Sequence, residues 1–406
     1  MKNKIKILIK KGVEFKNPDS VFIGDEVDVA RISGSNVIIY PGTRIYGKKT
    51  LIMNGAKLGF EAPVTIDNMF IGSETNLKGG FFENSVFLGE NSFGSGAHVR
   101  QGSILEEQAG AGHCVGLKHT ILFPFVQLGS LINFCDCLMA GGTSRKNHSE
   151  VGSSFIHFNY TPYQDKATPS IFGNIYQGVM LNNKPIFLGG QGGIVGPCKF
   201  AFGTLQAAGT IYRKDEKRPD RLIFGGSLKQ GSIKRKNNFP LDIKRKYINN
   251  CNYIAQLIAL MNWYKYVRSL FVSDFFSKEL YKGIKDILQM AINERIKKLE
   301  DFCFKLKKSR NYFLSKSKNE QSNIIIQYNS IIEKWNYVKE TFIIETQCEN
   351  SSNINNNEFL KHIKQSIKNN GKDYIKVIKN LDSVYADIGS LWLKNIKNQI
   401  MEKVII

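Results

Sequence analysis

The sequence predicts a mainly β protein, a left-handed parallel β-helix followed by an α-helical C-terminal domain. The first observation is a six-residue repeat of small apolar residues between Val21 and Lys214. The second is a glycine that often follows the apolar residue, as in Ile71-Gly72. The third is a change in composition near Pro240. All ten prolines lie at or before this position, and only 3 of the 36 glycines lie after it.

The repeat is the strongest of these signals. One phase of it runs through Val99, Leu105, Ala111, Leu117 and Phe123, each six positions after the last. A period of six matches neither the 3.6-residue period of a helix nor the alternation of an ordinary strand. It is typical of a solenoid in which each short strand directs one aliphatic side chain into a narrow core. The glycines suit the tight corners between strands, where a Cβ atom would obstruct the backbone.

Composition and pattern divide the chain into four parts. Residues 1–20 are expected to cap the open end of the solenoid, as terminal repeats must. Residues 21–216 form the β-helix, with a polar excursion at 141–185 of the kind that serves a binding cleft. Residues 217–250 form a basic linker. Residues 251–406 alternate Lys and Glu with aliphatic residues at helical spacing, and we expect a helical bundle packed against the solenoid end or a neighbouring subunit.

The net charge of +21 is spread evenly along the chain. Residues 1–240 carry 28 Lys and Arg against 18 Asp and Glu (+10), and residues 241–406 carry 28 against 17 (+11). This even spread argues against nucleic-acid binding and favours attraction of phosphorylated or nucleotide-bearing small molecules.

The sequence lacks the signals of a membrane or secreted protein and of a metal or disulfide site. No run of 18 apolar residues predicts a membrane span, and the apolar stretch near the start is too short for a signal peptide. We therefore expect a cytoplasmic protein. The seven cysteines show neither zinc-ligand nor disulfide spacing, so we expect reduced thiols and no metal site.

Four segments of the coils resemble one family. They are 96–102 (GAHVRQG), 115–118 (VGLK), 151–160, which is similar to IGAGTITCNY, and 188–210, which ends in AAGT. Together they resemble the acetyltransferase half of the bifunctional N-acetylglucosamine-1-phosphate uridyltransferase/glucosamine-1-phosphate acetyltransferase. Fuller phrases such as GLKHTILFPFV resemble a bacterial branch described as UDP-N-acetylglucosamine pyrophosphorylase-like.

The resemblance implies a set of substrate-binding residues. Arg100, Lys118 and the loop residue Lys166 would hold a sugar phosphate or its uridine nucleotide, while Asn159 and Tyr160 would position the sugar amine and the thiol end of the acyl carrier. The spacing of Arg100 and Lys118 agrees with this, because residues one coil apart lie about one strand spacing (~4.8 Å) from each other. Two cations so close are unfavourable without an anion between them. The alternative interpretation is that Arg100 and Lys118 are two solvated basic residues on a face of the solenoid.

The resemblance also implies acetyl-CoA as a co-substrate. Gly190 takes the place of the family's serine near the thioester, and Ala207 and Ala208 match the small residues that admit the coenzyme A arm. Backbone N–H groups near 190–193 would stabilise the developing oxyanion, as such donors do in acyl transfer. The family resemblance further implies a homotrimer with sites between subunits.

The departure from the family concerns the general base, which is a histidine there. In this chain the position falls on Phe134 or Asp136, depending on where an extra hexapeptide is placed. Asp136 would need a raised pKa to match imidazole as a base. His148, in the polar stretch SRKNHSE, is the other candidate base. The alternative interpretation is that His148 is a hydrogen-bonded loop histidine without a catalytic role. His157 lies in a predicted strand and is expected to be structural.

Two functions follow as hypotheses. The first is a hexapeptide-repeat N-acetyltransferase of amino-sugar or nucleotide-sugar metabolism. The second is a catalytically inactive nucleotide-sugar-binding or scaffold protein. No segment of this sequence resembles the glycine-rich LxxGxGTRM motif of the uridyltransferase half, so we expect any nucleotidyltransferase step to reside on a separate partner chain.

Overall fold

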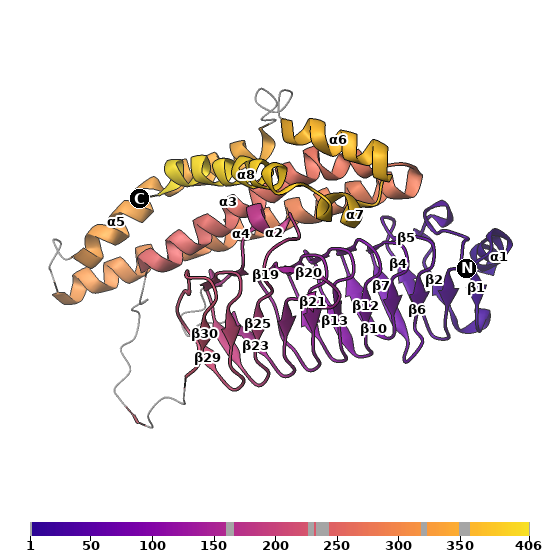
Figure 1. Ribbon diagram of the computed structural model, residues 1–406. Coiled ribbons are helices and arrows are strands. Elements are labelled where there is room, and N and C mark those ends of the chain that lie inside the picture. Colours follow the sequence, from indigo (N-terminus) through magenta and orange to yellow (C-terminus); the bar gives the residue numbers. More distant parts are fainter. Residues whose placement is uncertain are drawn as a thin grey trace.

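The computed structural model describes residues 2–159, 166–225, 231–232, 243–317, 323–348 and 358–405. It is a parallel β-solenoid of about 11 turns followed by a C-terminal helical region, which confirms the predicted fold class and is consistent with a left-handed β-helix. Figure 1 shows the coils stacked in a row, with the helices lying lengthwise over one side of them.

Three faces of short parallel strands build the solenoid. Face A has the order β1 (Glu14–Phe15), β3 (Ile38–Ile39), β6 (Lys57–Leu58), β9 (Asn76–Leu77), β12 (Ser92–Phe93), β15 (Gly110–Ala111), β18 (Gln127–Leu128), β22 (Glu150–Val151), β25 (Phe187–Leu188), β28 (Leu205–Gln206) and β30 (Leu222–Ile223). Face B comprises β2 (Phe22–Ile23), β4 (Arg44–Tyr46), β7 (Val64–Asp67), β10 (Gly80–Glu83), β13 (Ala97–Val99), β16 (Gly116–Leu117), β23 (Ile156–Phe158), β26 (Gly193–Val195) and β29 (Ile211–Tyr212). Face C comprises β5 (Leu51–Ile52), β8 (Phe70–Ile71), β11 (Val86–Phe87), β14 (Ile104–Leu105), β17 (Ile121–Leu122), β19 (Cys137–Met139), β24 (Ser170–Phe172) and β27 (Lys199–Phe200).

The six-residue repeat supplies the core between these faces. Val99 on face B, Leu105 on face C and Leu117 in the next coil of face B are fully buried. Successive coils are in parallel register, with Val99 opposite Leu117 and Leu105 opposite Leu122. Asn133 bridges the two parts of face B, pairing with Gly116 on one side and Ile156 on the other. The narrow core and the stacked strands are therefore products of one sequence period.

The N-terminal coil is closed by helix α1 (Lys2–Lys11), which buries Leu8. Lys4 donates hydrogen bonds to the backbone oxygens of Gly24 (2.9 Å) and Val27 (2.8 Å), which the first coil would otherwise leave open. Two 3₁₀ turns, η1 (Pro18–Ser20) and η2 (Val29–Arg31), complete this end. Strand β1 already pairs with β3 at Glu14, so the coils begin before residue 21.

In the polar segment at 141–185, the described residues (141–159 and 166–185) form regular coil strands as well as two excursions. One excursion is an antiparallel hairpin, β20 (Gly142–Ser144) and β21 (Asn147–His148), which projects from the corner between faces C and A. The other contains the short helix α2 (Ile175–Gly178), at the same corner one coil later. Strands β22, β23 and β24 lie in regular coils between them, so the segment is not a single departure from the solenoid.

The helical region lies along face C. It comprises α3 (Ile243–Tyr266), the 3₁₀ turn η3 (Arg268–Phe271), α4 (Phe275–Ser317), α5 (Asn323–Gln347), α6 (Glu358–Asn370), α7 (Tyr374–Lys379) and α8 (Ser383–Val404). Helix α4 contacts β5, β8, β11 and β14, and α3 contacts β24. The expectation of packing against the solenoid end is thus wrong for this chain, and the first helix begins at 243 rather than 251. Among the described helices, none is long and apolar enough to cross a membrane.

A buried ionic cluster joins the helical region to the corner between faces C and A. Nη2 of Arg268 lies 2.7 Å from the Glu106 carboxylate and 2.8 Å from that of Glu107, and the guanidinium stacks 3.3 Å above the Tyr374 ring. Tyr264 donates a 2.6 Å hydrogen bond to Glu106. Burial raises the pKa of Glu106, although Arg268 opposes the shift. The two glutamates therefore depend on Arg268 as their buried counter-charge.

Replacing Arg268 by alanine is expected to lower the free energy of unfolding by about 3–5 kcal/mol, because it leaves two carboxylates without their buried partner. Urea denaturation followed by circular dichroism would measure the change. Lys49→Ala is the control, since the Lys49–Asp286 pair is half exposed (54% for each side chain) and such pairs contribute about 0–1 kcal/mol. Equal stability of both variants would contradict the role of the cluster.

Candidate functional site

The corner that links face B to face C, here called the B–C corner, carries part of the predicted site. In the successive coils that carry them, Asn84 (φ 43°), Gly102 (φ 77°), His119 (φ 49°) and Asp136 (φ 59°) take a left-handed backbone conformation there. Asparagine, aspartate and histidine are enriched at such torsions, and glycine accepts them freely. A Cβ atom on Gly102 would lie 2.2 Å from His119 Nδ1, so the glycine also makes room for the imidazole in the next coil.

Arg100 and Lys118 lie side by side at the edge of face B. The residues before them, Val99 and Leu117, are register partners, and the Arg100 N–H donates to the Leu117 carbonyl at 2.9 Å. Arg100 is exposed and Lys118 is half-buried. Within the described chain, no carboxylate lies within 4.0 Å of either cation. The structure thus brings the two predicted phosphate-binding side chains together without a counter-charge.

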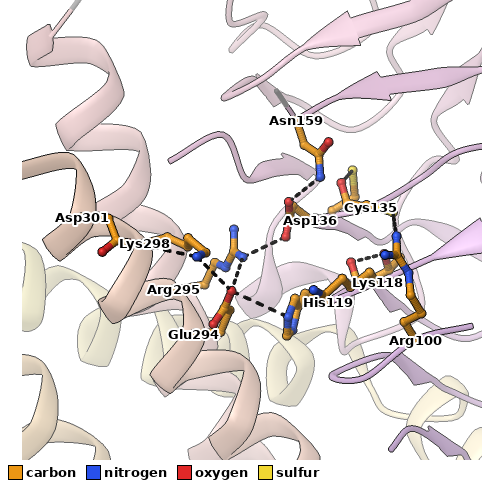
Figure 2. A network of polar contacts seen from close by, with 12 residues as sticks. Arg100, Lys118, His119, Cys135, Asp136, Asn159, Glu294, Arg295, Lys298 and Asp301 are labelled. Atoms are coloured by element: carbon orange, nitrogen blue, oxygen red, sulfur yellow. Dashed lines mark hydrogen bonds and ion pairs between the residues drawn. The ribbon is translucent and has the colours of Figure 1, made fainter. Parts of the chain in front are cut away.

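Asp136 lies next to them in the following coil, with its backbone N–H donating to the Lys118 carbonyl at 2.8 Å. One carboxylate oxygen accepts a 2.8 Å hydrogen bond from the Asn159 amide. The other oxygen lies 2.8 Å from Nη2 of Arg295, which comes from helix α4. Figure 2 shows Asp136 held between Asn159 on the solenoid side and Arg295 on the helical side. The helical region therefore supplies a residue to this corner.

The electrostatics of Asp136 differ from those required of a general base. Burial raises its pKa, but Arg295 and the Asn159 amide outweigh burial and the net pKa lies below the usual value of an aspartate. Phe134, the other position left open by the sequence, is fully buried in the core and stacks on Phe172 with ring centroids 5.6 Å apart. Of the two positions, only Asp136 meets Asn159, and it does so as a stabilised carboxylate.

Two buried histidines flank this carboxylate. His119 is 5% exposed, and within the described residues neither of its ring nitrogens has a hydrogen-bond partner. Burial, aided by Arg295, lowers its pKa to about 3. His157 is hydrogen-bonded through Nε2 to Ser170 at 2.7 Å, and burial lowers its pKa to about 4. Both imidazoles are therefore neutral at physiological pH.

His148 lies away from the B–C corner. It ends the β20–β21 hairpin at the opposite edge of face C, and strand β19 runs between it and Asp136. Its Nδ1 donates to the Arg145 carbonyl at 2.8 Å, and its Nε2 lies 3.5 Å from Glu150. The structure thus does not bring the two candidate bases together, and His148 has the contacts of a hydrogen-bonded loop histidine.

The remaining predicted residues are divided between two edges of face B. Gly190, Ala207 and Ala208 lie at the corner that links face A to face B, here called the A–B corner, after strands β25 and β28. The B–C corner with Arg100 and Asp136 is the other edge of that face. Within one chain the predicted coenzyme A residues therefore do not meet the predicted phosphate-binding residues. Lys166 is exposed, and Tyr160 lies outside the described residues.

Sequence reasoning missed two residues of this corner, His119 and Arg295. His119 directly follows Lys118, but a lone histidine in a coil carries no signal of burial. Arg295 occupies a Lys- and Glu-rich helix, where an arginine ordinarily faces solvent. Only the docking of α4 on face C identifies it, since its side chain is 3% exposed.

A three-faced parallel β-solenoid with cations and an amide at one corner is consistent with an acyltransferase domain of the hexapeptide-repeat class. The homologues of the chain are proteins described as the bifunctional protein GlmU. That of Streptococcus uberis is 25% identical over 233 residues, covering 56% of this chain and 45% of the relative. That of Carboxydothermus hydrogenoformans is 25% identical over 214 residues (53% and 42%), and that of Thermotoga maritima is 24% identical over 213 residues (52% and 42%). No protein-family model matches the chain.

The chain thus spans less than half the length of these relatives. The relatives support a connection to acetyltransferases and UDP-N-acetylglucosamine metabolism at the level of the family.

The two buried histidines predict how stability depends on pH. In the unfolded chain each titrates near pH ~6.5, whereas the folded values lie at about 3 and about 4. As the pH falls from 7 to 5, the unfolded state takes up protons that the folded state does not, and stability falls by roughly 2 kcal/mol for each histidine. Asp136, whose folded pKa is lowered, contributes only as the pH falls below about 4.

Urea denaturation at pH 7, 6 and 5 would measure this dependence. Asparagine suits the left-handed torsion at position 119. His119→Asn is therefore expected to lose roughly 2 kcal/mol less stability between pH 7 and 5 than the parent protein. His148→Asn, at a side chain that retains solvent contact (23% exposed), serves as the control. An equal pH dependence in His119→Asn and the parent protein would show that His119 is not buried as a neutral imidazole.

Proposed function

We propose that this protein is an acyltransferase-like protein of amino-sugar nucleotide metabolism. It binds a sugar phosphate or UDP-linked amino sugar at the B–C corner and transfers an acetyl group from acetyl-CoA to the sugar amine. The observation that carries this proposal is the stacking of Arg100 on Lys118, one coil apart, with the Asp136–Asn159 pair in the coils that follow. The GlmU relatives agree with the class of substrate.

The phosphate would lie between Arg100 and Lys118. At about one strand spacing, two unpaired cations repel each other, and an anion between them converts that repulsion into two favourable contacts. Arg100 presents a planar fork of donors suited to phosphate oxygens, and Lys118 adds a compact charge. Half-burial of Lys118 reduces screening by solvent and strengthens the attraction.

Asn159 stands where the sugar amine would be oriented, since its amide offers both a donor and an acceptor. Its Nδ2 already donates to Asp136, which leaves the Oδ1 acceptor for an amine. In the transfer, the amine nitrogen forms a bond to the thioester carbonyl carbon, the carbon–sulfur bond breaks, and the amine proton passes to a base. Asp136 is the candidate base at this corner.

The acetyl-CoA residues require a second copy of the chain. Gly190, Ala207 and Ala208 lie at the A–B corner, so a neighbouring copy would have to bring its A–B corner to the B–C corner of the first. The helical region covers face C, which leaves faces A and B for contacts between copies. A homotrimer around a three-fold axis satisfies both conditions.

A second candidate is supported by the Asp136–Arg295 pair. An aspartate whose pKa is lowered by a buried guanidinium is a weak proton acceptor. In this alternative the protein binds a nucleotide sugar without transferring an acyl group and serves a separate nucleotidyltransferase. The two candidates share the phosphate site and differ only in turnover.

Arg100→Ala and Lys118→Ala are each expected to weaken binding of UDP-N-acetylglucosamine and glucosamine 1-phosphate by about 10- to 100-fold, the effect of removing one charge-assisted contact. Isothermal titration calorimetry measures the affinity, and thermal unfolding with and without ligand gives an independent readout. Arg44→Ala is the matched control, because Arg44 is an exposed arginine on the same face. Equal affinities of Arg100→Ala and Arg44→Ala would overturn the phosphate site.

Turnover separates the two candidates. Release of free thiol from acetyl-CoA in the presence of glucosamine 1-phosphate, reduced about 100-fold or more by Asp136→Asn, would support the transferase. Asp67→Asn, at the same edge of face B, is the matched control. Loss of turnover in His148→Ala instead would assign the base to His148. Binding of UDP-N-acetylglucosamine without thiol release would support the binding protein.

A further inference from the structure

A polar pocket lies at the corner between faces C and A, on the other side of face C from the B–C corner. It has a volume of about 510 Å³ and is lined by residues of α2 and the loop after it, by β27, and by the segment 217–220. This volume falls within the range of roughly 300–1,000 Å³ typical of small-molecule sites. Figure 1 shows α2 between the coils and the overlying helices α3 and α8. None of the predicted site residues lines it.

The lining of the pocket carries a surplus of positive charge. It contains three lysines, Lys184, Lys199 and Lys217, against one carboxylate, Asp220. Lys184 lies 2.8 Å from Asp220 and is neutralised by it. Two positive charges are therefore left in the pocket.

Lys199 is the most constrained of these cations. It is the outward-facing residue of β27, is half-buried, and in the described chain its ammonium forms neither a hydrogen bond nor an ion pair. Burial lowers its pKa, and the nearby charges of Lys397 and Lys217 add to the shift, while the Asp215 carboxylate opposes it. Holding an ammonium among like charges and away from water is unfavourable. An anion bound beside Lys199 would remove that cost.

The rest of the pocket suits a phosphorylated molecule with a polar body. The Asn183 amide is held by hydrogen bonds to the Gln177 carbonyl (3.0 Å) and to Asn182 Oδ1 (2.8 Å), which leaves the Asn182 amide as a donor. Tyr176 and Phe202 add aromatic walls. Amide donors and ring faces together recognise a sugar or a base better than they recognise a bare ion.

We propose that this pocket binds a small phosphorylated molecule whose phosphate lies between Lys199 and Lys217. The site is separate from the B–C corner, and it does not depend on the function proposed for that corner. Its ligand class is a phosphate ester or diphosphate with a sugar or nucleoside body.

The parent protein for this test is the full-length variant Arg100→Ala/Lys118→Ala, which lacks both proposed phosphate contacts at the B–C corner. Pyrophosphate, uridine monophosphate and glucosamine 1-phosphate are titrated into it by calorimetry. At least one of these probes is expected to bind saturably. Preference for pyrophosphate would indicate a site for phosphate alone, and preference for either of the other two would indicate that the pocket also recognises the sugar or nucleoside. Adding Lys199→Gln or Lys217→Gln should weaken binding at least tenfold.

Lys57→Gln, at an exposed lysine of face A, is the matched control and should change the affinity less than twofold. Without ligand, Lys199→Gln is expected to keep or raise the midpoint of thermal unfolding, because it removes a repelled charge. A lysine with a purely structural role would lower that midpoint instead. Absence of saturable binding up to millimolar probe, or equal affinity in Lys199→Gln and Lys57→Gln, would overturn the proposal.

Discussion

The backbone hydrogen bonds between successive coils determine which side chains meet in this protein. At the B–C corner the Gly102 N–H donates to the Asn84 carbonyl at 3.0 Å, and the Asp136 N–H donates to the Lys118 carbonyl at 2.8 Å. Each bond fixes one coil over the previous one, so residues one coil apart become neighbours. Arg100, Lys118 and Asp136 form one surface only because this register is maintained through three coils.

That dependence explains which parts of the molecule could be predicted from the sequence. The apolar period specifies the coils, and a separation of 18 residues was enough to place Lys118 beside Arg100. The same counting left Phe134 and Asp136 as alternatives, because coil length is not constant. Gly80 lies 16 residues after its partner Val64, and Ala97 lies 17 after Gly80. Phe134 and Asp136 are only two residues apart, yet the first is a core position and the second a corner position.

The contribution of the helical region could not be predicted in the same way. An amphipathic pattern shows that a helix has an apolar face, but it does not say what that face covers. Helix α4 covers face C, and this places Arg295 within 2.8 Å of Asp136. Such pairs contribute less to stability than their Coulomb attraction suggests, since both charges lose their hydration. The pair is better understood as a constraint, because it links the packing of α4 on face C to the ionisation of Asp136.

This constraint bears on the chemistry that the corner can perform. A carboxylate that accepts a proton must lose some of its stabilisation when it does so, and the buried Arg295 makes that loss larger. A motion of α4 away from face C would weaken the ion pair and raise the pKa of Asp136 towards the range of a base. Helix α4 covers face C, so in the proposed homotrimer the contacts between copies would come from faces A and B. The helices therefore restrict the acid–base chemistry of Asp136 and leave two of the three faces of the solenoid uncovered by α4.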